Sequence, residues 1–151
     1  MSADGIFQVC GLMAVLGWLC LLLTPVWPKT VRERLPRLVG AIVIPGVIAA
    51  IYTVLIGMHW SSHVGDFNSL DGVMLLFTNR WLVLAGWVHY LAFDLFVGGW
   101  ELEDSRQRGV PHLVMVPILL LTFFFGPMGL LLYLGVRFVI QKRSGEISAR
   151  A

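Results

Sequence analysis

The stretch that decides the fold is AGWVHYLAFDLFVGGW, residues 85–100. Within the apolar segment 81–100 it has the length of roughly 20 residues that a helix needs to cross a bilayer. Yet it holds His89 and Asp94 near its middle and runs directly into Glu101. An ionisable side chain at membrane depth costs about 3 kcal/mol on insertion scales and usually marks a functional site or a polar contact inside a helix bundle. We therefore place any chemistry of this chain in this stretch.

The composition indicates an integral membrane protein. Of the 151 residues 58% are hydrophobic and 13% are charged, which leaves too little polar surface to cover a water-soluble domain. The net charge of +2 points to no nucleic-acid partner, since the basic residues stand between apolar segments, where lipid headgroups explain them. Cys10 and Cys20 stand ten residues apart in one apolar segment, about 15 Å along a helix, which is beyond the reach of a disulfide.

Unbroken apolar segments predict the architecture. Because lipid offers no partner to backbone polar groups, such segments form helices. We predict an all-α integral membrane bundle that forms one domain over residues 1–144, with both termini on the same side and a flexible polar tail over residues 145–151. The first helix has no basic residues before it and no small-residue cleavage site, so we interpret it as a retained span and not as a signal peptide. The four predicted transmembrane helices cover about 6–23, 38–58, 81–100 and 113–136.

Helix breakers and short connections add detail to this bundle. Pro45-Gly46 lies inside the second segment and Gly126-Pro127 inside the fourth, where they predict a kink around a cavity or a simple packing bend. The apolar stretch 70–77 is too short to span and predicts a surface or re-entrant helix. The connection 101–112 is interpreted as a solvated loop in which Glu103 and Asp104 pair with Arg106 and Arg108, whereas Glu101 continues the helix stripe of Asp94.

The distribution of basic residues sets the orientation only weakly. With the N-terminus outside, six Lys and Arg residues fall in the inner connections and five in the outer connection and tail. The positive-inside rule is therefore nearly balanced. The first connection, residues 26–37, holds four of the basic residues and favours termini outside.

The third segment orients its polar residues in different directions. At 100° per residue, Trp87, Asp94 and Glu101 lie on one stripe of the helix with Gly98 beside them. His89 lies about 140° around the helix from Asp94 and about 7.5 Å along it, so the two are no intrahelical pair. Either each faces a different neighbour or both border one wide cavity.

The spacing of the histidine and carboxylate residues gives little support to a metal or cofactor site. His89, His112, Asp94 and Glu101 are ligand types that suit iron or zinc, but their spacing matches no short motif such as H-E-x-x-H. Haem ligation would rest on His89 alone, and no glycine-rich phosphate loop is present. We expect no metal and no cofactor.

Several motifs resemble one protein family. The strings GWVHYLAFDLFVG (86–98), VPH (110–112) and FGPMGLLLY (125–133), together with SLDGV (69–73), resemble the abscisic-acid-deficient-four-like family over roughly the C-terminal half of the chain. Plant members of that family are chloroplast membrane proteins needed to form neoxanthin from violaxanthin. This chain shows no evident transit peptide, so the resemblance implies a bacterial member in the inner membrane.

The resemblance implies an isomerisation in which a carotenoid 5,6-epoxide is protonated and a proton is then removed to leave an allene. That chemistry needs a general acid and a general base beside a long apolar slot. His89 and Asp94 are the candidate catalytic pair, in either order. The candidate substrate-binding residues, which would hold a hydroxylated ring or line the slot, are Trp87, Tyr90, Phe93, Gly98, Glu101, His112 and Tyr133.

Four functions remain open on the sequence. The first is an isomerase acting on a carotenoid or another isoprenoid. The second is a non-catalytic pigment- or lipid-binding protein, or an assembly partner for an enzyme. The third is a small transporter that uses Asp94 and that, with four helices, requires an oligomer. The fourth is a metal or haem protein.

Overall fold

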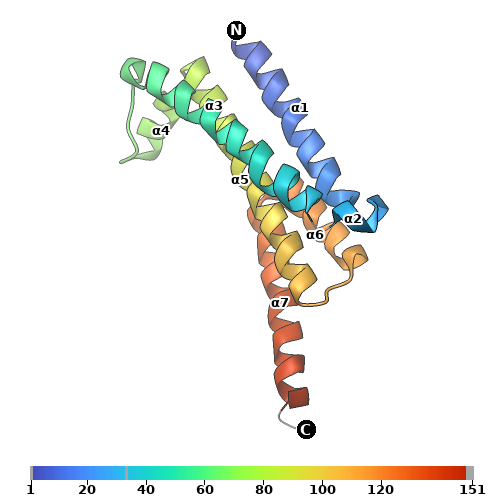
Figure 1. Ribbon diagram of the computed structural model, residues 1–151. Helices are drawn as coiled ribbons and strands as arrows, with labels where there is room; N and C mark the ends of the chain where they lie inside the picture. The colour runs from blue at the N-terminus through green and yellow to red at the C-terminus, as the bar shows by residue number, and fades with distance from the viewer. Residues whose placement is uncertain (1, 33, 149–151) are drawn as a thin grey trace.

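The computed structural model describes residues 2–32 and 34–148, and its secondary structure is helical throughout that part of the chain (Figure 1). Among these residues, three helical stretches are long and apolar enough to cross a membrane. The first is α1, Ala3–Leu22, the second joins the wide-turned helix η2, Pro36–Val43, to α3, Ile44–His59, and the third is α5, Arg80–Gln107. The predicted helical membrane architecture is confirmed for these three spans.

The first two spans begin and bend where their sequences require it. The hydroxyl of Ser2 caps α1 by accepting a hydrogen bond from the Gly5 amide at 3.1 Å. A π-helical turn over η2 precedes Pro45, which lacks an amide hydrogen and crowds the carbonyl four residues earlier. Short helical turns connect the spans: η1 (Thr24–Val26), α2 (Lys29–Arg32), η3 (Trp60–Ser62) and α4 (Leu70–Leu76).

The central element is α5, which packs against α1, η2, α3, α6 and α7. Small residues let its neighbours approach closely, since a Cβ atom at Gly98 would lie 2.5 Å from the ring of Trp18. The helix extends seven residues beyond Trp100, so the prediction of a loop over 101–112 is wrong for most of its length. Near its end, Glu103 pairs with Arg37, and Asp104 pairs with Arg108 and Arg137.

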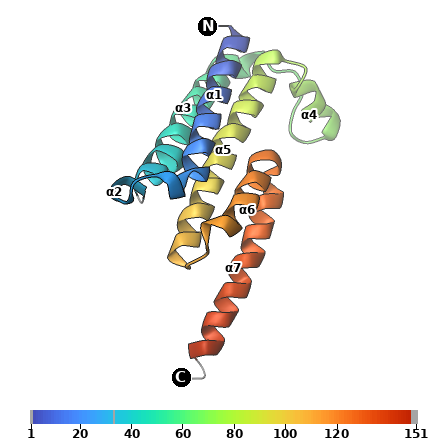
Figure 2. The ribbon, with the colours of Figure 1, turned by 90° about the vertical axis from the view of Figure 1, so that its right-hand side faces the viewer.

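The predicted fourth transmembrane helix, 113–136, is wrong. The chain forms a hairpin of α6, His112–Phe125, and α7, Pro127–Ser148, which pack side by side. Gly126 joins them with a φ of +29°, a conformation that favours glycine. The turn lies beside the middle of α5 (Figure 2). An apolar run that hydropathy counts as one span therefore enters the bundle and returns.

This hairpin also reverses the predicted placement of the chain ends. The N-terminal end of α1 and the C-terminal end of α7 lie at opposite ends of the molecule (Figures 1 and 2), so the prediction that both termini share one side is wrong. The helix α7 continues to Ser148, past the position where the polar tail was expected to begin. The last three residues of that tail lie outside the described residues.

Two buried clusters hold the bundle together. One, around Ile48, Leu84 and Val88, joins α1, α3 and α5. The other, around Leu95 and Met115, joins α1 and α5 to the hairpin. Cys10 and Cys20 are buried free thiols, as their spacing predicts, and the segment 70–77 forms the surface helix α4 at the N-terminal end of the molecule (Figure 1).

Candidate functional site

The two predicted catalytic side chains lie in different surroundings. The ring of His89 is exposed, stacks on Phe93 with centroids 4.5 Å apart, and meets the ring of Tyr52 edge-on at 5.2 Å. Asp94 is half-buried and faces Gly126, where a Cβ atom would lie 2.7 Å from Oδ1. The contacts of His89 are with α3 and those of Asp94 with the hairpin turn, so the structure does not bring the pair together.

An apolar groove runs between α3 and α5 on the side that His89 occupies. Its volume is about 350 Å³, at the lower end of the range for ligand pockets, roughly 300–1,000 Å³. Tyr52 follows the groove by one turn on α3, and His89 precedes it by one turn on α5. Because these helices run in opposite directions, both side chains stand at the same end of the groove. Its lining is Ala41, Ile42, Pro45, Gly46, Ala49, Ala92, Phe93 and Phe96.

The other side of α5 presents carboxyl groups to the hairpin. Glu101 is fully buried, and its Oε2 lies 2.8 Å from the hydroxyl of Thr122 on α6. The remaining oxygens, Glu101 Oε1 and Asp94 Oδ2, are buried with no hydrogen-bond partner. Tyr90 lies on the same side and donates its hydroxyl hydrogen to the carbonyl of Phe123 at 2.9 Å. The single stripe predicted for Asp94 and Glu101 is therefore the face that the hairpin covers.

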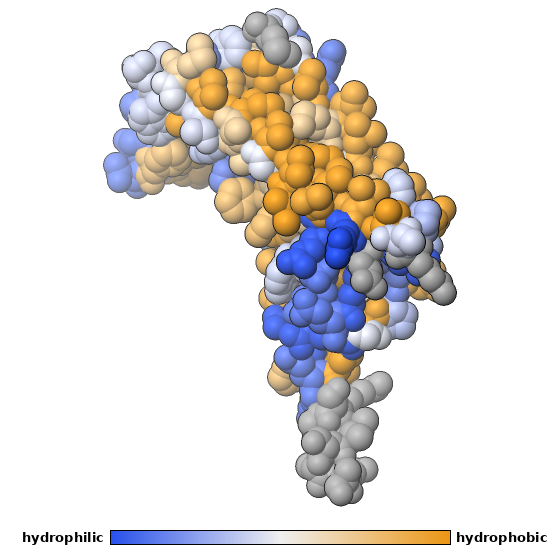
Figure 3. Space-filling model, viewed as in Figure 1, coloured by the Kyte–Doolittle hydropathy of each residue, from blue (hydrophilic) through white to orange (hydrophobic). Residues whose placement is uncertain are grey.

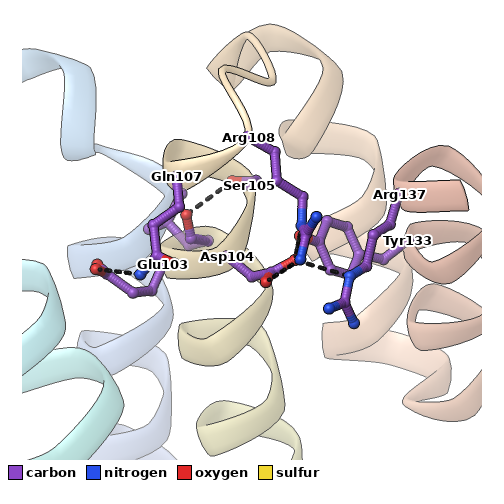
Figure 4. Close-up of polar contacts among 8 residues, drawn as sticks. Glu103, Asp104, Ser105, Gln107, Arg108, Tyr133 and Arg137 are labelled. Atoms are coloured by element: carbon purple, nitrogen blue, oxygen red, sulfur yellow. Dashed lines mark hydrogen bonds and ion pairs between the residues drawn. The ribbon is translucent and has the colours of Figure 1, made fainter. Parts of the chain in front are cut away.

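Asp104 forms the polar contact that closes the base of the hairpin (Figure 4). Arg108 donates to both of its oxygens, at 2.7 and 3.1 Å, and the guanidinium of Arg137 on α7 lies 3.3 Å from Oδ2. The hydroxyl of Tyr133 donates to the same oxygen. Hydrogen bonding to Asp104 raises the pKa of the Arg108 guanidinium, so this arginine stays charged.

The roles of Arg108 and Arg137 differ in how far the sequence could predict them. Asp104 and Arg108 are four residues apart, a spacing that favours an ion pair on a helix. Arg137 directly follows the predicted fourth helix, 113–136, which offers it no particular partner. The hairpin turns α7 back toward the end of α5 and places Arg137 beside Asp104.

The other predicted site residues are distributed over the bundle. Trp87 is 42% exposed and stacks on Phe7 of α1. His112 Nε2 lies 2.9 Å from the carbonyl oxygen of Leu22. The ring of Tyr133 is buried against Trp100, and the ring of Trp18 packs directly on Gly98, in the space that a side chain there would need. The structure brings Phe93 and His89 to the groove, and Tyr90, Asp94 and Glu101 to the hairpin.

No metal-binding cluster occurs among the residues that the structure describes, where a group of three or more His, Cys, Asp or Glu side chains close enough to share an ion is absent. The four candidate ligands considered from the sequence, His89, His112, Asp94 and Glu101, are dispersed. His89 contacts aromatic rings, His112 contacts a backbone carbonyl, and the two carboxyl groups face the hairpin.

The fold and these side chains define a class: a helical multi-pass membrane protein with ionisable groups inside its central span. Comparison with protein families gives a match to the ABA DEFICIENT 4-like (ABA4-like) model over residues 5–133. The chain belongs to this family, as the motifs predicted, and the match extends beyond the C-terminal half to the first two spans. Neither the curated proteins nor the solved structures gave a match.

Proposed function

We propose that this protein binds a carotenoid or another isoprenoid in the groove between α3 and α5. The observation that carries the proposal is the position of His89 and Tyr52 at one end of a groove whose lining is wholly apolar. A long hydrocarbon chain fits the apolar part, and the imidazole and phenol offer hydrogen bonds to an oxygenated ring at its end. Membership of the ABA DEFICIENT 4-like family supports this class of ligand.

A second candidate function, isomerisation of the bound isoprenoid, is favoured by Asp94. A carboxyl oxygen buried in a membrane span without a hydrogen-bond partner is costly, which is typical of a site kept for function. His89 borders the groove and would exchange a proton with the ligand, whereas Gly126 covers Asp94. Joint acid–base catalysis by the two therefore requires the hairpin to move. We place this activity, as the resemblance implies, in a bacterial inner membrane.

The binding proposal is tested by filling the groove. Gly46 lines the groove, and a Cβ atom there meets no heavy atom within 4 Å, so the side chain of Gly46→Leu has room to extend into the space for the ligand. We expect wild-type protein purified from cells that make hydroxylated and epoxidised carotenoids to show carotenoid absorption bands, and Gly46→Leu to lose most of them.

Gly57→Leu is the matched control, since Gly57 lies on the same helix, outside the groove lining, and is equally unobstructed. It should retain the pigment. A colourless wild-type protein, or a Gly46→Leu variant that keeps its pigment, contradicts the groove as the binding site.

The same preparations separate binding from catalysis. If the protein is an isomerase, mass spectrometry of the extracted pigment detects an isomerised product in the wild type. His89→Ala and Asp94→Asn then keep the substrate bound but form no product. If the wild type returns only unchanged carotenoid, the protein binds without acting on it.

A further inference from the structure

The hairpin encloses a carboxyl group that the proposed ligand groove does not use. Glu101 has no exposed surface, and its Oε1 has no hydrogen-bond partner. The hairpin closes over it because Gly129 of α7 packs directly on Thr122 of α6, so closely that a Cβ atom at Gly129 would clash with the threonine hydroxyl and backbone. The Glu101 carboxyl is therefore held at the interface of three helices and away from lipid and water.

The contacts of Thr122 bear on the protonation state of this carboxyl group. Its hydroxyl oxygen lies 2.8 Å from Glu101 Oε2 and 3.1 Å from the carbonyl oxygen of Ile118. A threonine hydroxyl has one hydrogen and cannot donate to both oxygens. Both contacts are satisfied if Thr122 donates to Ile118 and Glu101, in its neutral form, donates its own proton to Thr122.

Among the side chains that the structure describes, none offers Glu101 a cation. On α5 and α7, Arg108 and Arg137 bind Asp104, as does Tyr133. A buried carboxylate without a counter-charge or a full set of hydrogen bonds is far more costly than a neutral carboxyl group. Asp94, on the same side of α5, faces Gly126 and adds a second carboxyl group to the surroundings of Glu101, not a cation. The other titratable and basic groups of the neighbouring elements have contacts of their own or are buried thiols: Tyr90 with Phe123, His112 with Leu22, Arg106 with Arg32, Arg37 with Glu103, Asp4 with Arg80, and the thiols Cys10 and Cys20.

We propose that Glu101 is a proton-binding site enclosed by the α6–α7 hairpin, a neutral carboxyl group at neutral pH that donates its proton to Thr122. The site supplies an acid inside the bilayer, on the same stripe of α5 as Asp94. Removal of this proton places an uncompensated charge beneath the hairpin, so hairpin packing is coupled to protonation. This inference does not depend on the isoprenoid groove, which lies on another side of α5.

The test is infrared spectroscopy of the full-length protein in lipid nanodiscs. We expect a protonated-carboxyl C=O band at neutral pH in the wild type. Because Asp94 also has a buried carboxyl oxygen without a hydrogen-bond partner, the variants are compared in an Asp94→Asn background. There the band persists with Asp104→Asn, disappears with Glu101→Gln, and changes frequency with Thr122→Val because the hydrogen bond to the threonine is lost. Absence of the band from Asp94→Asn at neutral pH, or its survival in the Asp94→Asn/Glu101→Gln double variant, overturns the proposal.

Thermal unfolding gives an independent readout. A glutamine is the neutral isostere of a protonated glutamate, so Glu101→Gln should unfold near the wild-type temperature. Asp104→Asn, which removes the charge that binds two arginines, should unfold at a lower temperature. A Glu101→Gln variant that fails to fold, or is destabilised as much as Asp104→Asn, contradicts the proposal.

Discussion

At Gly126 a single residue determines the course of the last part of the chain. Its φ of +29° lies in a region that L side chains rarely adopt, and a Cβ atom there would lie 2.7 Å from the Asp94 carboxyl group. The sequence shows Gly126-Pro127 as a helix breaker, but the same two residues are compatible with a kinked helix and with a reversal of the chain. Contact of the turn with α5 favours the reversal, and the local sequence does not show that contact.

The residue-scale prediction concerns this turn. Gly126→Ala should lower the free energy of unfolding by about 1–3 kcal/mol, because it combines backbone strain with a clash against Asp94. Thermal unfolding in detergent measures the effect. Gly57→Ala, at an unobstructed helical position, should leave stability unchanged or slightly increased. Equal behaviour of the two variants contradicts the turn geometry.

The surroundings of His89 and Asp94 show how far residue-level reasoning extends. Their separation of five residues on a helix correctly excludes an intrahelical pair. The neighbours of each, Tyr52 for His89 and Gly126 for Asp94, depend on which helices flank α5. That arrangement follows from packing between distant segments, which one sequence does not specify.

At the scale of elements, hydropathy predicts spans well where they are straight. The first three segments appear as α1, η2 with α3, and α5, because each needs one continuous helix to satisfy its backbone in lipid. The hairpin meets the same requirement with two helices. The 14 residues of α6 extend about 21 Å, which is short of a hydrocarbon core of about 30 Å, so its turn stays within the bundle.

Close packing of α6 and α7 gives the element-scale prediction. Gly129 lies against the backbone of Thr122, which cannot move aside as a flexible side chain would. Gly129→Ala should therefore separate the two helices and cost about 1–3 kcal/mol of stability by overpacking.

The control for this variant is on the same helix. Gly135 has open space at its Cβ position, so Gly135→Ala should be neutral in the same thermal unfolding measurement. If Gly129→Ala is tolerated equally well, α6 and α7 do not pack as a hairpin.

At the scale of the whole molecule, the hairpin makes the distribution of basic residues between the two ends of the bundle unequal, whereas the four-helix prediction divided them almost evenly. The C-terminal end of α7 lies at the same end of the bundle as the first connection and the end of α5 (Figures 1 and 2). Hydrophilic residues gather around that end below the apolar surface (Figure 3). Among the described residues, the opposite end holds Arg80, which pairs with Asp4. The basic residues at the hydrophilic end are Lys29, Arg32, Arg34, Arg37, Arg106, Arg108, Arg137 and Lys142.

The positive-inside rule then predicts a cytoplasmic basic end and an external N-terminus. We expect a membrane-impermeant maleimide to label Ser61→Cys in intact cells, and to label Thr30→Cys and Gln141→Cys only after the membrane is opened. The native Cys10 and Cys20 are replaced by alanine in all three variants. Labelling of Gln141→Cys together with Ser61→Cys in intact cells would restore the fourth span and exclude the hairpin.

The half-depth turn at Gly126 has a consequence for biosynthesis. With the basic end in the cytoplasm, α6 and α7 enter the bilayer and return to the side where the ribosome stands, so the arginines and lysines of these two helices do not cross the hydrocarbon layer. Only the residues before α1 and the connection between α3 and α5 then have to cross. In that orientation the hairpin can join an already inserted three-helix core without help from the export channel.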